Sequence, residues 1–452
     1  MKVYIQKFKR FCLIFAARIA GAGALFAANL LIARELGFEN LATYAVFVSL
    51  VSIGAVVLSS GFPAVAPIFV TEYSTLDKPG YIKGFAKKAL GQGAKLCVLL
   101  TAIFICIWSL NLDSALFVQI DVVIAIILAI CASALLNLNG SVLVGMKKQV
   151  AALLPETFIR PVVFLTFLSA FLWFGNSKEI DAVLWLITGS LLVTCGIIAL
   201  RDRKLHKSII SEKSCSEEKR WKSAAYPWMG ISLLWDFMID LVILLVSIMA
   251  SSIELAILHI CFRYRVLAGF GMRTIHTLMM PEITQDCVEK DKQKLQSNIF
   301  LLNSVSLVYS LAVLLAFTLF GSYALAIFSP EAASSVPVLL LVSSTMIFRA
   351  ALGPGPLLLA IHGLHKYTLL SSIVGLTLGA AFILATYDNL GIISAAIGYT
   401  GANLIISASL WILAKRKTGI DTSIFGGMLQ RLKSGRKSPV PMADDQAKSI
   451  YP

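Results

Sequence analysis

Charged side chains interrupt two consecutive apolar stretches in the middle of the sequence, 227–249 and 255–280. The first carries Asp236 and Asp240, and the second carries His259, Arg263, Arg265 and Arg273. An ionised side chain at the middle of a bilayer costs roughly 3 kcal/mol on insertion scales, so it persists where it faces a wet cavity or a partner. We therefore expect the functional site to lie at these charges.

Arginine side chains in such a place suit the binding of anions. A guanidinium group offers paired donors to phosphate or carboxylate oxygens and keeps its charge at physiological pH. At a rise of about 1.5 Å per residue, Arg263 and Arg265 lie roughly 12 to 15 Å from the start of their stretch, close to mid-depth. Two residues apart, they point to faces about 200° apart, so at most one faces a central axis. Arg263 is favoured because it shares a face with His259.

Three further arginines are candidates for substrate binding. Arg18 lies about six residues into the first apolar stretch. Its side chain could therefore extend to the bilayer surface instead of binding substrate, which is the alternative interpretation. Arg273 is expected near the mouth of a cavity. Arg349 lies inside another apolar stretch, shortly before a Gly-Pro-Gly-Pro run. The predicted binding residues are thus Arg18, Arg263, Arg265, Arg273 and Arg349.

Asp236 and Asp240 are four residues apart and would share one face of a continuous helix. One interpretation pairs them with the arginines of the next stretch, where they would neutralise buried charge. The other makes them the site of a coupling ion, H⁺ or Na⁺, because two carboxylates that repel each other at low dielectric can exchange a proton. Both roles can coexist if proton uptake releases an arginine for its substrate.

The elements that position these residues are predicted to be membrane-spanning helices. Hydrophobic residues make up 58% of the chain and charged residues 14%, with a mean hydropathy of +0.82. A spanning helix needs roughly 20 mainly apolar residues, and about twelve segments qualify. They are residues 12–33, 41–70, 92–111, 116–143, 152–174, 182–200, 226–249, 255–279, 298–320, 334–360, 367–386 and 391–414. The predicted fold class is an all-α polytopic membrane protein.

Basic residues predict the orientation of these helices, because Lys and Arg collect in short cytoplasmic loops. With the N-terminus inside, the outer loops hold only Lys178, plus Arg34 at a helix end. An even number of spans returns the C-terminus to the cytoplasm. The net charge of +14 then reflects topology rather than nucleic-acid binding. The basic start and first apolar run continue into further spans, so we expect a retained helix rather than a cleaved signal peptide.

The halves of the chain resemble each other and predict two lobes. Six spans precede the polar segment 201–225 and six follow it. SVLVGMKK at 141–148 and LAIHGLHK at 359–366 share a Gly-x-x-Lys turn at a shift of 218 residues, which also sets Arg18 opposite Asp236. Two parallel repeats favour a transporter with its substrate site between the lobes. The predicted parts are a six-helix lobe at 1–200, a cytoplasmic linker at 201–225, a six-helix lobe at 226–414 and a basic cytoplasmic tail at 415–452.

Glycine and proline predict breaks within two spans. Gly61-Phe-Pro63 lies in the second span, and Gly353-Pro354-Gly-Pro356 lies in the tenth. Such residues kink a helix, and the freed backbone groups must then face protein or a cavity. The run from Gly353 to Pro356 is a predicted hinge, although bending for packing explains it equally well. Arg34, beside Glu35 at an outer helix end, is predicted to be structural or part of an outer gate.

Other functional classes find little support in the sequence. The eight cysteines match neither a disulfide framework nor a metal site. There is no Walker glycine loop, no His-Glu-x-x-His and no nucleophile elbow. We expect a transporter without catalytic residues, metal or cofactor apart from a coupling ion.

Several segments together resemble a known family. Residues 18–37 are RIAGAGALFAANLLIARELG, followed by YAVF at 44–47 and SGF at 60–62; LPETFIRP at 154–161, LMMPE at 278–282 and LLLAIHG at 357–363 agree further. The chain resembles the polysaccharide transporter family, the Wzx-type flippases of the multidrug/oligosaccharidyl-lipid/polysaccharide exporter superfamily. The resemblance covers nearly the whole chain through loose motifs, of which Ala-Arg-x-Leu-Gly is the sharpest.

The resemblance implies a MATE-like, V-shaped pair of lobes in the bacterial inner membrane. It implies transport of undecaprenyl-pyrophosphate-linked oligosaccharide, such as an O-antigen unit of lipopolysaccharide, from the cytoplasmic to the periplasmic leaflet. The implied partners are this glycan, membrane lipids, a polysaccharide polymerase and a chain-length regulator. Such polyanionic cargo fits a cavity with several arginines.

Two alternatives stand beside the flippase. A multidrug or small-solute antiporter of the same superfamily would be expected to have an acidic cavity, whereas the intramembrane arginines here outnumber the aspartates. A membrane-embedded glycan polymerase resembles this chain in hydropathy but usually has a large periplasmic loop, and every outer loop here is short.

Overall fold

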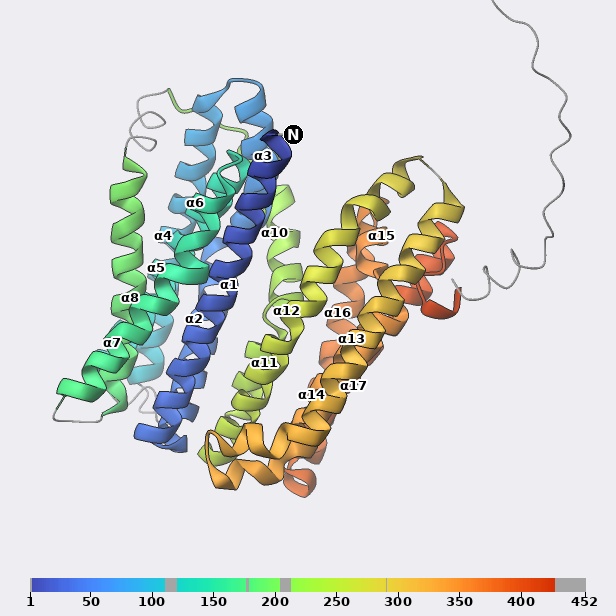
Figure 1. Ribbon diagram of the computed structural model, residues 1–452. Coiled ribbons are helices and arrows are strands. Elements are labelled where there is room, and N and C mark those ends of the chain that lie inside the picture. Colours follow the sequence, from blue (N-terminus) through green and yellow to red (C-terminus); the bar gives the residue numbers. More distant parts are fainter. Residues whose placement is uncertain (1, 110–119, 176–178, 204–212, 290, 427–452) are drawn as a thin grey trace, which may run out of the picture.

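The computed structural model is built entirely of helices over the residues that it describes. These are residues 2–109, 120–175, 179–203, 213–289 and 291–426. The helices form two groups that lie side by side and diverge towards the end at which α1 begins (Figure 1). We call this end, which also holds Lys415, Arg416 and Lys417 in the last turn of α17, the basic end.

The first group contains the helices that precede residue 202, and we call it the N lobe. Its elements are α1 (Lys2–Glu35), α2 (Phe38–Ser59), α3 (Phe62–Thr75), α4 (Pro79–Ser109), α5 (Ile120–Gly145), α6 (Gln149–Leu154), the π-helix η1 (Pro155–Ile159), α7 (Arg160–Phe174) and α8 (Ile180–Arg201).

The second group follows and forms the C lobe. Its elements are α10 (Glu218–Trp235), α11 (Met238–Val246), α12 (Ser252–Glu289), α13 (Lys292–Ala326), the 3-10 helix η2 (Pro330–Ser335), α14 (Val336–Leu352), α15 (Gly355–Ile361), α16 (His365–Leu390) and α17 (Ile392–Thr418).

The helices match the predicted membrane spans. Among the described residues, ten helical segments are long and apolar enough to cross a bilayer, and α10 with α11 forms a bent pair that counts as an eleventh. Helix α4 contains residues 92–109 of the remaining predicted span, 92–111, whose last two residues lie outside the described residues. Large apolar side chains such as Val98, Trp173 and Val308 are exposed on the helices, as a lipid-facing surface requires. The prediction of an all-α multi-pass membrane protein is therefore confirmed.

Two predicted spans are broken where glycine permits a left-handed backbone. The predicted helix 41–70 is divided into α2 and α3 at Ser60 and Gly61, whose φ angles are 49° and 76°. The predicted helix 334–360 is divided into α14 and α15 at Gly353, with φ of 77°. A Cβ atom on Gly61 would lie 2.0 Å from the carbonyl oxygen of Ala225, so this glycine also allows α10 to approach.

A third break divides the predicted span 226–249 at Asp236 and Phe237, where α10 and α11 meet at a bend of 61°. Neither glycine nor proline lies at this point. The backbone N–H groups of Asp236 and Phe237 both turn towards the carbonyl oxygen of Ser232, at 2.9 and 3.4 Å. Because the break separates Asp236 from Asp240, the expectation that they share one face of a continuous helix is wrong.

Helix α10 begins inside the segment predicted as a linker. Trp221 is fully buried against Phe85 and Tyr73 of the N lobe, and its indole N–H donates to the Tyr73 hydroxyl at 2.8 Å. On the surface, Arg220 forms an ion pair with Glu72 at 2.8 Å. The chain thus passes from one lobe to the other within a helix, which starts at Glu218 rather than at residue 226.

The first residues of the predicted tail pack against the C lobe. The Thr422 hydroxyl donates to the carbonyl oxygen of Leu352, and the Thr422 carbonyl oxygen accepts from the Asn303 side chain at 2.7 Å. The first bond satisfies the Leu352 carbonyl oxygen at the break before Gly353, and the second satisfies the backbone of the docked segment itself. The remainder of the predicted tail, 427–452, lies outside the described residues.

Candidate functional site

A cavity of about 280 Å³ lies between the two lobes. Helix α1 and the junction of η1 with α7 form its N-lobe wall, and α12 forms its C-lobe wall. Three of the predicted binding residues line it: Arg18, Arg263 and Arg273. Arg18 and Arg273 are exposed and Arg263 is half-buried, so a solute can reach the charges. Glu156 of η1 is the acidic residue in the lining.

The helix arrangement explains why these arginines meet. Helices α1 and α12 run antiparallel beside each other, so a residue early in α1 lies near a residue late in α12 (Figure 1). Arg18 and Arg273 lie within electrostatic reach of each other. A Cβ on Gly21 would lie 1.7 Å from the carbonyl oxygen of Thr157, so a glycine here lets α1 lie directly on η1. Like charges in one cavity repel, and an anion would relieve that repulsion.

Deeper in the interface, Arg263 belongs to a polar chain that joins the lobes. The Nε atom of Arg263 lies 3.2 Å from the Nε2 atom of His259, and this ring nitrogen lies 2.8 Å from the Oδ1 atom of Asn29 in α1. Both His259 and Asn29 are 1% exposed. A neutral imidazole Nε2 either donates or accepts, so its two contacts compete for one nitrogen. The other nitrogen, Nδ1, is buried and has no hydrogen-bond partner among the described residues.

Asp240 makes a second polar contact across the interface. The Ser49 hydroxyl of α2 donates to its Oδ1 atom at 3.0 Å. The Tyr44 ring, also from α2, packs edge-on against His259 with ring centroids 6.0 Å apart. The C-lobe residues Asp240 and His259 thus contact buried polar side chains of the N lobe directly, and Arg263 is joined to them through His259.

Arg265 and Arg349 lie on the C-lobe side of this region. The Nε atom of Arg265 donates to the Thr345 hydroxyl at 3.3 Å, and its guanidinium lies 5.8 Å from the centre of the Tyr399 ring. The Arg349 guanidinium lies over the Trp235 ring at 4.8 Å, while its Nε is buried and has no hydrogen-bond partner in the part of the chain that the structure describes. The structure therefore directs Arg263 towards the cavity and Arg265 into the C lobe.

Asp236 lies at the break between α10 and α11, within electrostatic reach of Arg273 and Arg349. Within the described parts of the chain, no ion pair of 4.0 Å or less joins Asp236 or Asp240 to an arginine. The structure thus favours carboxylates that lie near positive charge over carboxylates that are neutralised by a direct ion pair.

The lobes are held together at the end opposite the basic end. Arg34, at the end of α1, donates from Nε to the carbonyl oxygen of Ile327 at 2.7 Å. Between this bond and the cavity, the rings of Phe26, Tyr264 and Phe328 pack edge-to-face with centroids 5.1 to 6.0 Å apart. The cavity is therefore closed on this side, and Arg34 lies where a gate would be.

The predicted hinge lies away from the cavity. Gly353, Pro354 and Pro356 lie at the junction of α14 and α15, beside Asn303 and the docked Thr422. No residue of this junction lines the cavity between the lobes.

Sequence reasoning missed Asn29, Ser49 and Glu156. Asn29 lies in an apolar stretch. A polar amide within a membrane helix indicates a buried partner or a site, as the intramembrane arginines and aspartates do, so Asn29 could have been recognised in the same way. Ser49 gives no comparable signal, because serines in membrane helices commonly bond to their own helix backbone.

Solved transporter structures are similar to this chain over nearly its whole length. The inward-facing conformation of a multidrug resistance MATE family transporter of the MOP superfamily superposes with a TM-score of 0.70 at 15% identity, covering 92% of this chain and 96% of that one. The chain has the MATE transporter fold. A MATE structure in complex with MaL6 gives 0.65 at 14% identity, covering 95% and 97% of the two chains.

A transporter from Pyrococcus furiosus is also similar to this chain in fold. This MOP superfamily transporter superposes with a TM-score of 0.64 at 17% identity, covering 91% of this chain and 96% of that one. Its description states that reverse polarity of the binding pocket suggests a different function. No family model matches the sequence, and no curated protein matches it significantly.

Proposed function

We propose that this MATE-fold chain is a flippase that carries an undecaprenyl-pyrophosphate-linked oligosaccharide, such as an O-antigen unit, across the bacterial inner membrane. The observation that carries the proposal is the cavity between the lobes, in which Arg18, Arg263 and Arg273 converge. Pyrophosphate presents several oxygens to guanidinium donors, and Arg–phosphate contacts are among the strongest hydrogen bonds in proteins.

The charge balance favours an anionic cargo over the cationic cargo of the multidrug alternative. Three arginines line the cavity with one carboxylate, Glu156, and Arg265 and Arg349 lie on its C-lobe side. A multidrug resistance transporter is among the similar structures, so cationic or neutral drugs are the second candidate cargo. A cationic drug would have to approach this positive cavity against repulsion.

The contacts between the lobes suggest how transport proceeds. The cavity lies between lobes that diverge towards the basic end, which the positive-inside rule assigns to the cytoplasm. Cargo binding to arginines of both lobes draws the walls together, and the Arg34 bond and the aromatic contacts must then part on the other side. The oligosaccharide and pyrophosphate pass between the lobes while the prenyl chain stays in the bilayer.

Asp236 and Asp240 are the proposed sites of the coupling ion, H⁺ or Na⁺. Asp240 accepts from Ser49 of the opposite lobe, so its charge state affects a contact that lobe movement must break. We further place the glycan polymerase and the chain-length regulator among the protein partners, as consumers of the flipped unit.

Reconstituted vesicles test the proposal. The purified chain should move a fluorescent prenyl-pyrophosphate-linked oligosaccharide across the bilayer, and Arg263→Ala and Arg273→Ala should each slow the movement at least about tenfold, the loss of roughly 1.4 kcal/mol. Arg201→Ala is the matched control, because Arg201 binds Asp202 outside the cavity. Export of a cationic dye without movement of the anionic lipid would overturn the flippase in favour of the multidrug antiporter.

A further inference from the structure

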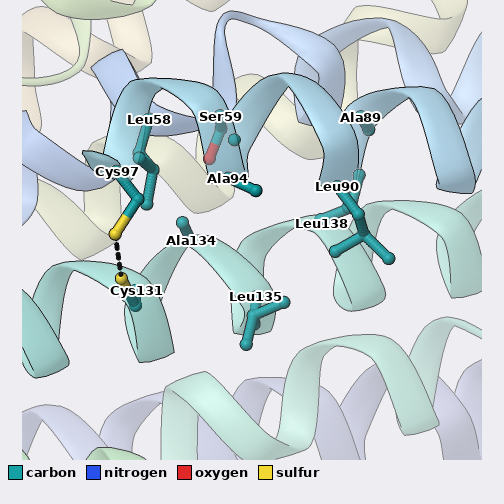
Figure 2. A pocket seen from close by; sticks show the side chains of 11 residues that line it. Leu58, Ser59, Ala89, Leu90, Ala94, Cys97, Cys131, Ala134, Leu135 and Leu138 are labelled. Carbon is teal, nitrogen blue, oxygen red and sulfur yellow. Dashed lines mark hydrogen bonds between the residues drawn. The ribbon is translucent and has the colours of Figure 1, made fainter. Parts of the chain in front are cut away.

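A long apolar groove lies on the N lobe, on helices other than those that form the cavity between the lobes. Two hollows of about 370 and 630 Å³ make up this groove. They adjoin each other because Leu90 of α4 and Leu135 and Leu138 of α5 line both. Residues of α2 complete the first hollow and residues of α8 complete the second. Figure 2 shows the first hollow, between α4 and α5.

The groove is long enough for a hydrocarbon chain. Along α4 it extends from Ile82 to Cys97, which is about 22 Å at a rise of 1.5 Å per residue. One leaflet contributes about half of the roughly 30 Å hydrocarbon core of a bilayer. Small residues line the first hollow, including Gly93 and the two alanines Ala94 and Ala134 that Figure 2 shows. The groove therefore has the depth and apolar character that one acyl chain of a single leaflet requires.

Two lysines give the groove a charged end. Lys83 and Lys87 both line it, and at i and i+4 they lie on one face of α4. Lys87 is exposed. The neighbouring Lys88 points elsewhere and pairs with Glu218 of α10. The two lysines lie towards the basic end of α4, at the depth where a lipid phosphate would lie above its acyl chains.

We propose that this groove is a binding site for an anionic phospholipid, with an acyl chain along α4 and α5 and the phosphate at Lys83 and Lys87. Charge complementarity selects the anionic headgroup, and the apolar length selects a lipid over a soluble phosphate. The site is formed by α2, α4, α5 and α8, whereas the arginine cavity is formed by α1, α7 and α12. The proposal therefore stands independently of the transported cargo.

A lipid in this groove would brace the outer helices of the N lobe. Any ligand that binds only the folded chain raises its apparent stability in proportion to the logarithm of its concentration. The effect should depend on the headgroup, because a zwitterionic lipid fills the apolar part but carries its own ammonium at the lysines. It should also weaken with salt, because the lysines lie near the bilayer surface.

Thermal unfolding of the purified full-length chain in detergent tests the site. Phosphatidylglycerol should raise the melting temperature of the unaltered chain, while phosphatidylcholine and inorganic phosphate should have much smaller effects. The variant Lys83→Gln/Lys87→Gln should require at least about fivefold more phosphatidylglycerol for the same shift. Lys95→Gln, on the same helix but outside the groove, is the matched control and should titrate like the unaltered chain.

Two further measurements keep the proposal falsifiable if the lysine variant folds poorly. Leu135→Trp retains both lysines and places a bulky ring in the groove, so it should also weaken phosphatidylglycerol binding. Mapped thiol alkylation should show that phosphatidylglycerol slows the reaction of Cys131 and leaves Cys106, outside the groove, unchanged. Equal stabilisation by phosphatidylcholine, equal titration of the lysine variant, or unaltered Cys131 reactivity would each overturn the proposal.

Discussion

His259 of the C lobe and Asn29 of the N lobe meet across the interface, with Nε2 and Oδ1 2.8 Å apart and both side chains almost completely buried. Arg263, which lines the cavity, donates from its Nε atom to the same ring nitrogen of His259 at 3.2 Å. Arg263 therefore belongs both to the cationic cavity and to the group of side chains that joins the two lobes. A ligand that draws Arg263 towards itself leaves that nitrogen entirely to Asn29.

The contact between His259 and Asn29 should be measurable as a coupling energy. We expect Asn29→Ala and His259→Ala, singly and together, to show a coupling of about 0.6 to 1 kcal/mol, the usual range for buried hydrogen bonds between membrane helices. Unfolding in mixed detergent micelles gives the four free energies. Asn29 with Asn403, which lies in α17, is the control pair and should show no coupling. A His259–Asn29 coupling of zero would contradict the proposed link.

Arg34 should hold the lobes together at the end opposite the basic end. Arg34→Gln should lower crosslinking between Glu39→Cys and Glu331→Cys, two exposed positions beside the Arg34 bond, by about fivefold. Losing roughly 1 kcal/mol shifts a two-state population by about that factor. Yields with a bifunctional thiol reagent, in a background without other cysteines, measure the effect. Arg34→Lys keeps a charged donor and should restore part of the yield; unchanged crosslinking in Arg34→Gln would exclude a gate at this position.

Substitutions of Arg263 and Arg265, the two mid-depth arginines, should have different effects. Arg265→Lys keeps the charge but changes the contacts with Thr345 and Tyr399, so we expect it mainly to lower the melting temperature. Arg263→Lys should mainly weaken binding of an anionic headgroup, since a lysine cannot form the bidentate contact. Binding of a soluble pyrophosphate analogue and thermal unfolding, measured on both variants, separate the effects. The reverse pattern would place the anion at Arg265.

Gly61 should tolerate no side chain. Gly61→Ala should destabilise the fold by about 1 to 3 kcal/mol, because the backbone is left-handed and the new Cβ would lie 2.0 Å from the Ala225 oxygen. Gly23→Ala is the control, since nothing lies within 4 Å of its Cβ position and alanine favours the helix. Thermal unfolding of both variants checks the difference. Equal melting temperatures would show that α10 can move away from Gly61 freely.

The docked segment at residues 420–425 should be insensitive to mild acid. Although burial alone would raise it, hydrogen bonds from Lys415, Trp411 and Ser423 lower the pKa of Asp421 to about 2. Because this value lies below the usual 3.8, the stabilisation is complete above about pH 4 and is lost as the pH falls towards 2. Hydrogen exchange of residues 420–425 should thus be equally protected at pH 5 and 7 after correction for intrinsic rates, whereas Asp421→Asn should lose protection at both.

The sequence predicted the helices well because apolar length and buried charge are local signals. The mid-depth arginines could be recognised for the same reason, since a charge within an apolar stretch stands out without knowledge of its neighbours. Helical spacing predicted that at most one of Arg263 and Arg265 faces the cavity, and the face shared with His259 favoured Arg263.

What the sequence could not predict depends on contacts between distant segments. The break at Asp236 and Phe237 carries no glycine or proline, so nothing local distinguishes it from a straight helix. Ser49 gains its importance only because α11 brings Asp240 to it. The start of α10 at Glu218 was hidden by charged residues that face solvent and other helices, while Trp221 and Ala225 are its buried residues.

Helix α10 is anchored to both lobes, at Trp221 in the N lobe and at Trp235 beneath Arg349 in the C lobe. Pro227 lies between these anchors and removes one backbone hydrogen bond from the helix. Rotation of one lobe against the other would therefore strain this short helix between its two anchors. Because Pro227 weakens the helix between its two anchors, α10 is expected to bend there. The energy of that bend would then help to set how readily one lobe rotates against the other.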